Sequence, residues 1–238
     1  MIDRRPIVCW LAVVGAAALL GGCGIGSVAT AETRNDALSF DLGTAKSAHV
    51  ELRMGSGELR VTSGTQKMME GTFAYNVADW KPVVDYRVSG TTGNLNIAQP
   101  NAGGSFGHTV NKWDVRLNGE VALEVTANLG AGEAHLELGH LNLSRVEMNI
   151  GAGKVTMDLR GEPKRDYDVQ IRGGVGETVV YLPKDARISA KATKGIGEIS
   201  TEGLQNRDGA WVNPDGIGAP VTVRLDVKGG VGAIRLMR

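Results

Sequence analysis

Histidines and nearby carboxylates are the residues of this sequence whose types could hold a metal ion. His135 and His140 lie close to Glu133 and Glu137, and such a grouping could bind a metal at the surface. His135 falls on the polar phase of an alternating segment, and His140 lies in an expected turn. Surface histidines of this kind are ordinarily solvated. We therefore predict no metal site and no cofactor.

A row of glutamates is the second candidate for chemistry. One glutamate directly follows each of four Gly-x-Gly motifs: Glu58, Glu133, Glu177 and Glu198. The row could form a stripe that binds calcium or a glycan, but Lys154 and Ala233 occupy the same position in the other two copies. Calcium-binding repeats carry Asp in their turns, which these motifs lack. The pattern favours a solvated strand face.

Serine and tryptophan residues offer no clearer reaction. Ser144, Ser189 and Ser200 have no evident His–Asp arrangement, although a triad is recognised by geometry and not by sequence order. Three tryptophans could line a sugar-binding face: Trp80, Trp113 and Trp211. Trp113 lies in an alternating segment, which favours burial, and the sequence leaves the exposure of the other two open. We predict no catalytic residue and no enzymatic activity.

Six Gly-x-Gly motifs are the feature that organises the sequence. Their glycines are Gly55, Gly57, Gly130, Gly132, Gly151, Gly153, Gly174, Gly176, Gly195, Gly197, Gly230 and Gly232. The middle four motifs recur every 21 to 23 residues, as in stacked-repeat proteins. A dinucleotide-binding loop would need a third glycine and a following helix. Strand-like segments follow instead, so the motifs indicate structural corners.

The residues around each motif alternate between apolar and polar. The positions three and five before the first glycine, and two and four after the second, total 24 over the six copies; 22 are apolar and two are Thr. This period of two predicts half-buried strands on both sides of a glycine corner. One such unit cannot bury its own apolar face, whereas stacked units share a continuous core. The pattern predicts an all-β, stacked-repeat β-solenoid, with a β-sandwich as the alternative.

The N-terminus has the form of an export signal. Arg4 and Arg5 precede a short apolar segment that ends at Gly21, Gly22 and Cys23. The ending resembles a bacterial lipobox, in which the cysteine is acylated after cleavage, so we expect lipid attachment at Cys23. The alternative is an ordinary secretory signal with an incidental cysteine. The lipid would anchor the chain to the outer membrane, if the source has one, or otherwise to the outer face of the plasma membrane.

The expected organisation has four segments. They are a signal peptide (1–22), a tether (23–47), an N-terminal β region (48–128) and the Gly-x-Gly repeat region (129–238). Segments 71–77, 81–88, 93–97 and 111–118 alternate as strands, and 205–220 is irregular. Basic and acidic residues balance at 26 each, so nothing favours nucleic acid as a partner. After cleavage only Cys23 would remain, which excludes an internal disulfide.

The order of motifs resembles a known family. Segment 50–61 is similar to the opening of the bacterial toast-rack proteins, and 70–77, 81–84, 93–97, 113–117 and the corners at 129–132 and 150–153 follow in the family's order. The repeat part is similar to LiaF-like C-terminal domains and to adhesin-like domains of envelope proteins. The resemblance covers residue 48 to the C-terminus and implies an all-β toast-rack or single-stranded β-helix-like fold. It implies no catalytic residues.

These observations favour a non-enzymatic envelope lipoprotein that presents a rigid β scaffold to a protein or cell-wall partner. Resemblance to LiaF-like domains implies a second hypothesis, a regulator or sensor of envelope stress, although this chain lacks the transmembrane helices of those proteins. A third hypothesis is an enzyme acting on wall glycans, which would need a pair of carboxylates in a cleft. The ligand, the partner and the oligomeric state remain open at this level.

Overall fold

The computed structural model describes residues 32–100 and 108–238, so the expected signal peptide and Cys23 lie outside the described residues. Within them, strands pair into a single sheet, and no helix is long and apolar enough to cross a membrane. The strands are β1 (Arg34–Phe40), β2 (Ser47–Thr65), β3 (Met69–Tyr75), β4 (Val83–Ser89), β5 (Thr92–Ala98), β6 (Asn111–Asn118), β7 (Ala122–Glu137), β8 (Leu143–Asp158), β9 (Tyr167–Tyr181), β10 (Arg187–Thr201), β11 (Gln205–Arg207), β12 (Ala210–Val212) and β13 (Thr222–Met237). Short 3-10 turns are η1 (Ala78–Trp80) and η2 (Pro214–Gly216).

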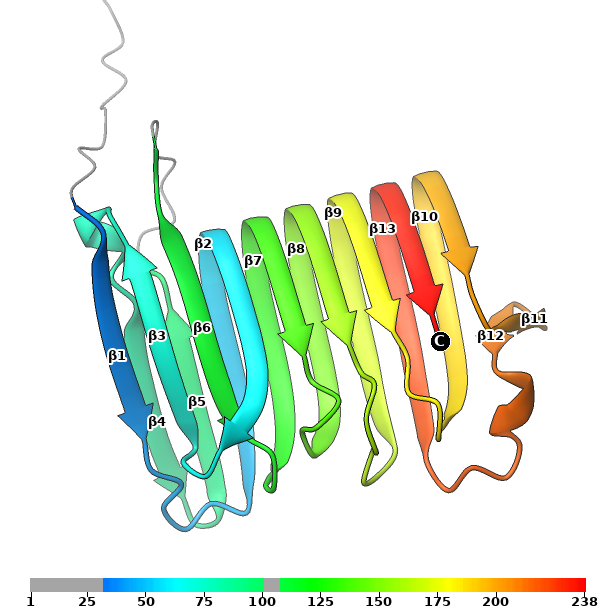
Figure 1. Ribbon diagram of the computed structural model, residues 1–238, viewed down its shortest axis with the longest axis horizontal. Helices are drawn as coiled ribbons and strands as arrows, with labels where there is room; N and C mark the ends of the chain where they lie inside the picture. Colours follow the sequence, from blue (N-terminus) through cyan, green and yellow to red (C-terminus); the bar gives the residue numbers. More distant parts are fainter. Residues whose placement is uncertain (1–31, 101–107) are drawn as a thin grey trace, which may run out of the picture.

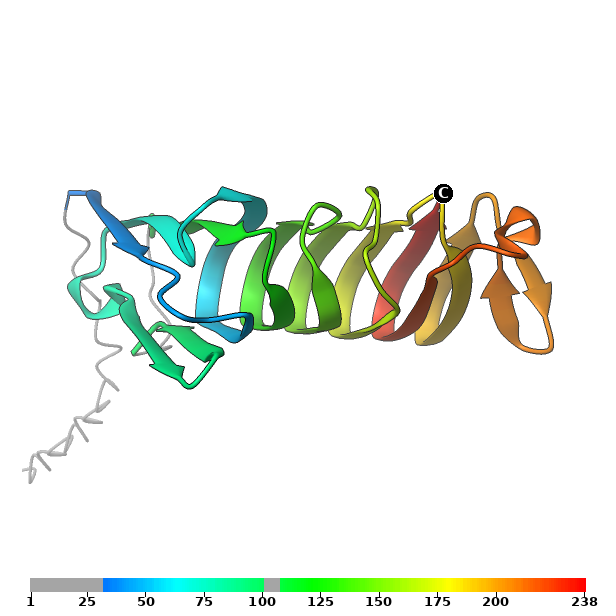
Figure 2. The same cartoon turned by 90° about the horizontal axis from the view of Figure 1, so that it is seen from below.

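Six long strands form the body of the molecule. Each of β2, β7, β8, β9, β13 and β10 contains one Gly-x-Gly motif and bends there into two arms that face each other (Figures 1 and 2). Neighbouring long strands run parallel, with motif beside motif in the ladder. We call each bent strand a rung. The predicted all-β stacked-repeat fold is confirmed, and the β-sandwich alternative is not, because the facing arms belong to the same sheet.

The N-terminal strands continue the two arms of β2 separately. β5 pairs in parallel with the first arm, Ser47–Arg53, and β4 pairs antiparallel with β5. β6 pairs in parallel with the second arm, and β3 and β1 follow it in antiparallel order. The sheet therefore divides at its N-terminal end into two wings, which Figure 2 shows as separate layers.

The core lies between the two arms of the rungs. All but three of the 24 inward positions expected from the sequence are buried; the three that remain partly exposed are Ala192, Ile199 and Thr201, all on the end rung β10. Burial of a side chain such as Leu52 or Val169 contributes about 1.5–3 kcal/mol, so the shared interior is the main source of stability. At each corner the second glycine has a positive φ, between 130° and 142°.

The structure corrects two details of the expected organisation. Residues 34–40, placed in the tether, form β1: Asp36 accepts a hydrogen bond of 2.9 Å from the Tyr75 hydroxyl. Most β1 side chains are exposed, so its local pattern is weak and pairing with β3 decides its conformation. The expected boundary between 128 and 129 falls inside β7, and one hydrophobic cluster includes residues from both sides.

Segment 205–220 is irregular, as expected, but it contains a short hairpin. β11 pairs with β12, and β12 pairs with β10 at Ser189 and Ala190. Asn213 links this segment to the start of β10, because its amide donates to the Ala186 carbonyl and its Oδ1 accepts from the Ile188 N–H. After this excursion the chain returns as β13, which lies between β9 and β10 and not beyond β10.

Candidate binding groove

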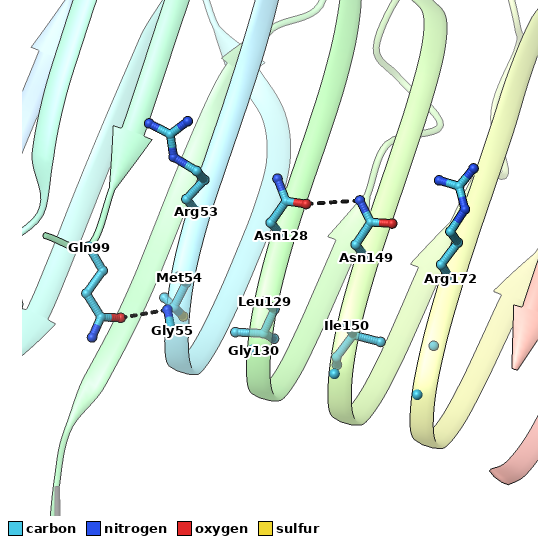
Figure 3. A pocket seen from close by; sticks show the side chains of 13 residues that line it. Arg53, Met54, Gly55, Gln99, Asn128, Leu129, Gly130, Asn149, Ile150 and Arg172 are labelled. Atoms are coloured by element: carbon cyan, nitrogen blue, oxygen red, sulfur yellow. Dashed lines mark hydrogen bonds between the residues drawn. The ribbon is translucent and has the colours of Figure 1, made fainter. Parts of the chain in front are cut away.

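An open groove of about 740 Å³ runs across four rungs beside their corners. Its polar wall is the row of residues two positions before the first glycine: Arg53, Asn128, Asn149 and Arg172, on β2, β7, β8 and β9 (Figure 3). These side chains point outward because the residues before and after them point into the core. The glycines that follow in each rung have no side chain, so the backbone forms the floor.

Hydrogen bonds hold the polar wall in place. The Asn149 amide donates to Asn128 Oδ1 at 2.9 Å. Arg172 Nη1 donates to Glu147 Oε1 at 2.7 Å, and this glutamate also accepts from Asn149 at 3.3 Å. At the other end Arg53 Nη1 donates to Glu51 Oε1 at 2.9 Å. Each guanidinium group also donates to one amide oxygen, Arg53 to Asn96 and Arg172 to Gln170, and retains further N–H groups for a ligand.

Side chains close the groove at its N-terminal end. Gln99, just after β5, accepts a hydrogen bond of 2.9 Å from the Gly55 N–H (Figure 3). The same Oε1 accepts from Asn111 Nδ2 at 2.9 Å, and Asn111 Nδ2 also donates to the Ser56 carbonyl at 2.7 Å. The Gln99 and Asn111 side chains therefore bond the backbone of the first corner on the side where a further rung would otherwise pair with it. The groove is thus bounded at β2 and continues toward β9.

The described lining of the groove is suited to hydrogen bonding. Among the described residues, its lining consists of guanidinium groups, carboxamides, apolar side chains and glycine backbone, and none of these residues is Asp, Glu, His, Cys, Ser or Lys. General acid–base catalysis needs a group that gains and loses a proton near the working pH, and a nucleophile needs such a group beside it. The arrangement can donate and accept hydrogen bonds along a ligand that crosses several strands.

The structure separates the histidines that the sequence places near one another. His49 Nδ1 lies 2.9 Å from Glu124, and His135 Nε2 lies 3.3 Å from Glu133. His140 is in the loop after β7. No group of three or more His, Cys, Asp or Glu that could hold a metal is present in residues 32–100 and 108–238.

The glutamate row lies in register on the second arms, and two of its members, Glu58 and Glu177, pair with cations. Lys112 Nζ lies 2.7 Å from Glu58, and this hydrogen bond lowers the pKa of the Glu58 carboxyl below its ordinary value. Glu177 pairs with Lys154 at 3.2 Å and also with Arg235. The row is therefore a solvated strand face on which two of the four glutamates are held in ion pairs.

The tryptophans do not form an exposed sugar-binding face. Trp80 and Trp113 are buried, and Trp113 packs edge-on against Phe73 with ring centroids 5.7 Å apart. Trp211 is half-buried beside β10. Two of the three rings therefore serve the core.

A separate hollow of about 620 Å³ lies over β1, β3, β6 and β2, and both acidic and basic side chains line it. Its carboxylates are Glu70 and Asp114. Glu70 pairs with Arg116 at 3.2 Å, and Asp114 is the register partner of Arg60. The carboxylates thus alternate with guanidinium groups on the outer face of the sheet.

The groove residues were not recognised in the sequence, although a signal for them exists. The position two before the first glycine is polar in all six copies, the other two being Thr193 and Lys228. A polar residue is expected at any outward position, so the row looks ordinary until the register places its members side by side. The twelve glycines expected at corners lie at the six bends, and Cys23 lies outside the described residues.

Comparison with known proteins places this architecture. Residues 29–181 match the family model described as the N-terminal domain of toast_rack. The structure of a candidate cell adhesion protein from Clostridium sporogenes is 30% identical, with a TM-score of 0.84, covering 87% of this chain and 99% of that one. A candidate adhesin from Bacteroides fragilis is 8% identical with a TM-score of 0.33, covering 86% of this chain and 97% of that one, which is too distant for further argument. No curated protein matches. With the family model spanning more than half of the sequence, this chain belongs to the toast-rack family.

Proposed function

We propose that this protein is a non-enzymatic component of the cell envelope, anchored by a lipid at Cys23, whose rigid β stack binds a cell-wall polymer. The lipobox-like end of the N-terminal segment supports the anchor. The likeness to a structure described as a candidate cell adhesion protein supports a binding role. Repeat stacks commonly bind along an extended surface, which suits a polymeric ligand.

The observation that carries this proposal is the groove with its row of two arginines and two asparagines. Adjacent strands lie about 4.8 Å apart, so the row from Arg53 to Arg172 extends over about 14 Å. A ligand that follows this row meets a cation, two amides and a second cation in turn. Wall polymers that carry hydroxyl, amide and carboxylate groups present the complementary acceptors and donors.

Cosedimentation of the protein with purified cell-wall sacculi tests the proposal. Arg53→Ala and Arg172→Ala each remove charge-assisted hydrogen bonds, worth about 1.5–3 kcal/mol apiece, and should weaken binding about 10-fold or more. Arg145→Ala is the matched control, because Arg145 lies on β8, is similarly exposed and does not line the groove. If Arg53→Ala and Arg172→Ala bind sacculi as tightly as Arg145→Ala does, the groove is not the binding site.

The anchor and the choice of partner need their own experiments. Metabolic labelling with a radioactive fatty acid should mark the wild-type chain and leave Cys23→Ser unlabelled; labelling of neither would favour an ordinary secretory signal. If sacculi do not bind, crosslinking in the native envelope can decide between a protein partner and no partner. Crosslinking to a membrane-embedded kinase would support the alternative, a regulator of envelope stress.

A further inference from the structure

The outermost rungs at the two ends of the stack differ in how their outer edges are paired. At the β2 end, Gln99 and Asn111 bond the backbone of the first corner, and β5 and β6 pair with the two arms. At the other end β10 pairs with β13 on one side. On its other side, in the part of the chain that the structure describes, only Ser189 and Ala190 are paired, with β12. Lys191–Thr201 is therefore a free strand edge, of the kind that other strands pair with.

Apolar surface gathers at this end. The middle residue of each motif points outward at the corner, and it changes from Ser56, Ala131 and Ala152 in the first rungs to larger side chains in the last. Val175, Val231 and Ile196 are neighbours in the ladder and are 56%, 46% and 72% exposed. The core also reaches the surface here, since Ala192 and Ile199 of β10 are only half-buried. Such an apolar end on a free edge is characteristic of an interaction surface.

The charges on the same edge are unpartnered. Outward residues of the inner rungs form ion pairs across the ladder, as Lys154 does with Glu177. Lys191, Lys194, Glu198 and Glu202 are exposed and have no ion-pair partner within the described residues. A strand added to β10 would face two positive charges before the bend and two negative charges after it.

We propose that the free edge of β10 binds a second copy of this chain, related by a twofold axis through the corner. β10 of each copy would pair antiparallel with β10 of the other, Ala192 opposite Ile199 and Lys191 opposite Ser200. Such an axis exchanges the two arms, so the bend of one copy stacks on the bend of the other and the shared interior continues across the interface. This isologous arrangement closes the assembly as a dimer.

The alternation of the strand selects this register. Ala192 and Ile199 both point inward, and residues opposite each other in an antiparallel pair lie on the same face. A shift by one residue would place inward residues opposite outward ones. The free segment also has the required length, because β12 occupies the edge up to Ala190 and the chain leaves it after Thr201.

The register also explains why the strand that pairs with this edge belongs to a second copy of the chain. Lys191 would lie diagonally beside Glu198 of the second copy, and diagonal neighbours are within reach of long side chains. Glu202 follows directly after the paired segment, at the end where Lys191 lies. The twofold axis repeats this contact, so the segment that carries Lys191 and Lys194 in one copy lies beside the segment that carries Glu198 and Glu202 in the other. The exposed Ile196 side chains of the two copies meet at the axis. No other strand is required to satisfy the edge.

Sedimentation velocity on the full chain in mild detergent tests this interface, with cosedimenting detergent accounted for. We expect a dimer at about 100 µM that dissociates on dilution, as for a small interface. Lys191→Glu should raise the dissociation constant about 10-fold or more, and adding Glu198→Lys and Glu202→Lys should restore it to within about 3-fold. Lys46→Glu is the control, because Lys46 is exposed, lacks an ion-pair partner among the described residues and lies at the start of β2, away from β10.

Each result decides for or against the proposal. All variants alter exposed side chains, so melting temperatures equal to the wild type should accompany the change in assembly. A monomer at all concentrations, or open-ended oligomers, would overturn a twofold interface at β10. The proposal is also overturned if Lys46→Glu weakens the dimer as strongly as Lys191→Glu does. It is overturned too if the dimer of the triple variant dissociates as readily as that of Lys191→Glu.

Discussion

Replacing Gly153 by alanine should destabilise the stack more than a surface methyl group ordinarily would. Gly153 is the second glycine of the β8 corner and has a φ of +134°. A Cβ atom on it would lie 1.8 Å from the carbonyl oxygen of Gly132 in the adjacent rung and 2.8 Å from its carbonyl carbon. Both contacts are with backbone, so no side-chain rotation can relieve them. The rungs β7 and β8 would have to separate at the corner.

The magnitude follows from two contributions. A non-glycine residue held at a strained φ costs about 1–3 kcal/mol. Separation of the corners weakens about two backbone hydrogen bonds between the rungs, at about 1 kcal/mol each. The total of about 3–5 kcal/mol corresponds to a decrease of about 6–20 °C in melting temperature for a domain of this size.

Circular dichroism melts of the wild type and four variants test this reasoning. Gly153→Ala and Gly153→Val should both lose the predicted stability. Gly173→Ala is the matched glycine control, because the nearest atom to its Cβ, Ile150 Cγ2, is 3.8 Å away and its φ is not in the positive range. Ala152→Val tests the adjacent outward position, which is already Val in two other rungs. A Gly153→Ala melt within about 2 °C of the wild type, or equal losses for Gly153→Ala and Gly173→Ala, would refute the account of the corner.

Two further predictions concern side chains that secure the ends of the stack. Asn213→Ala leaves the buried Ile188 N–H and Ala186 carbonyl without their partners and should cost about 2–4 kcal/mol in chemical denaturation, whereas Asn206→Ala, on exposed β11, should change little. The Lys112 hydrogen bond lowers the pKa of Glu58 below its usual 4.5, so this pair stabilises the fold above about pH 4.5, and that stability is lost as the pH falls through the lower folded-state pKa. Glu58→Gln should therefore melt below the wild type at pH 7 and coincide with it at strongly acidic pH; a constant difference at every pH would contradict the linkage.

Local sequence was sufficient to predict the strands because alternation and glycine are local signals. An inward residue such as Leu52 or Met148 can be recognised from its position relative to a Gly-x-Gly motif. The corners can be recognised because a backbone with positive φ, packed against another backbone, excludes a Cβ atom. β1 is the exception: its side chains are mostly exposed, and only pairing with β3 gives it a regular conformation.

The groove needed the register of the sheet. Arg53 and Arg172 are separated by more than a hundred residues, and no spacing in the sequence links them. They share a surface because parallel pairing places equivalent positions of successive rungs side by side. The same register gives Glu58 and Glu177 their ion pairs, because Lys112, Lys154 and Arg235 lie beside them on neighbouring strands.

The order of the last two rungs was decided by tertiary packing. The sequence by itself determined that residues around Gly195 and Gly230 form equivalent bent strands, since both carry the repeat pattern. It did not determine that β13 lies between β9 and β10, because either strand offers β9 the same backbone groups for pairing. The physical reason lies in their inward side chains: β13 carries Val227 and Leu236, which need a neighbour on both sides to be buried, whereas β10 carries Ala192 and Thr201, which lose little at an open end.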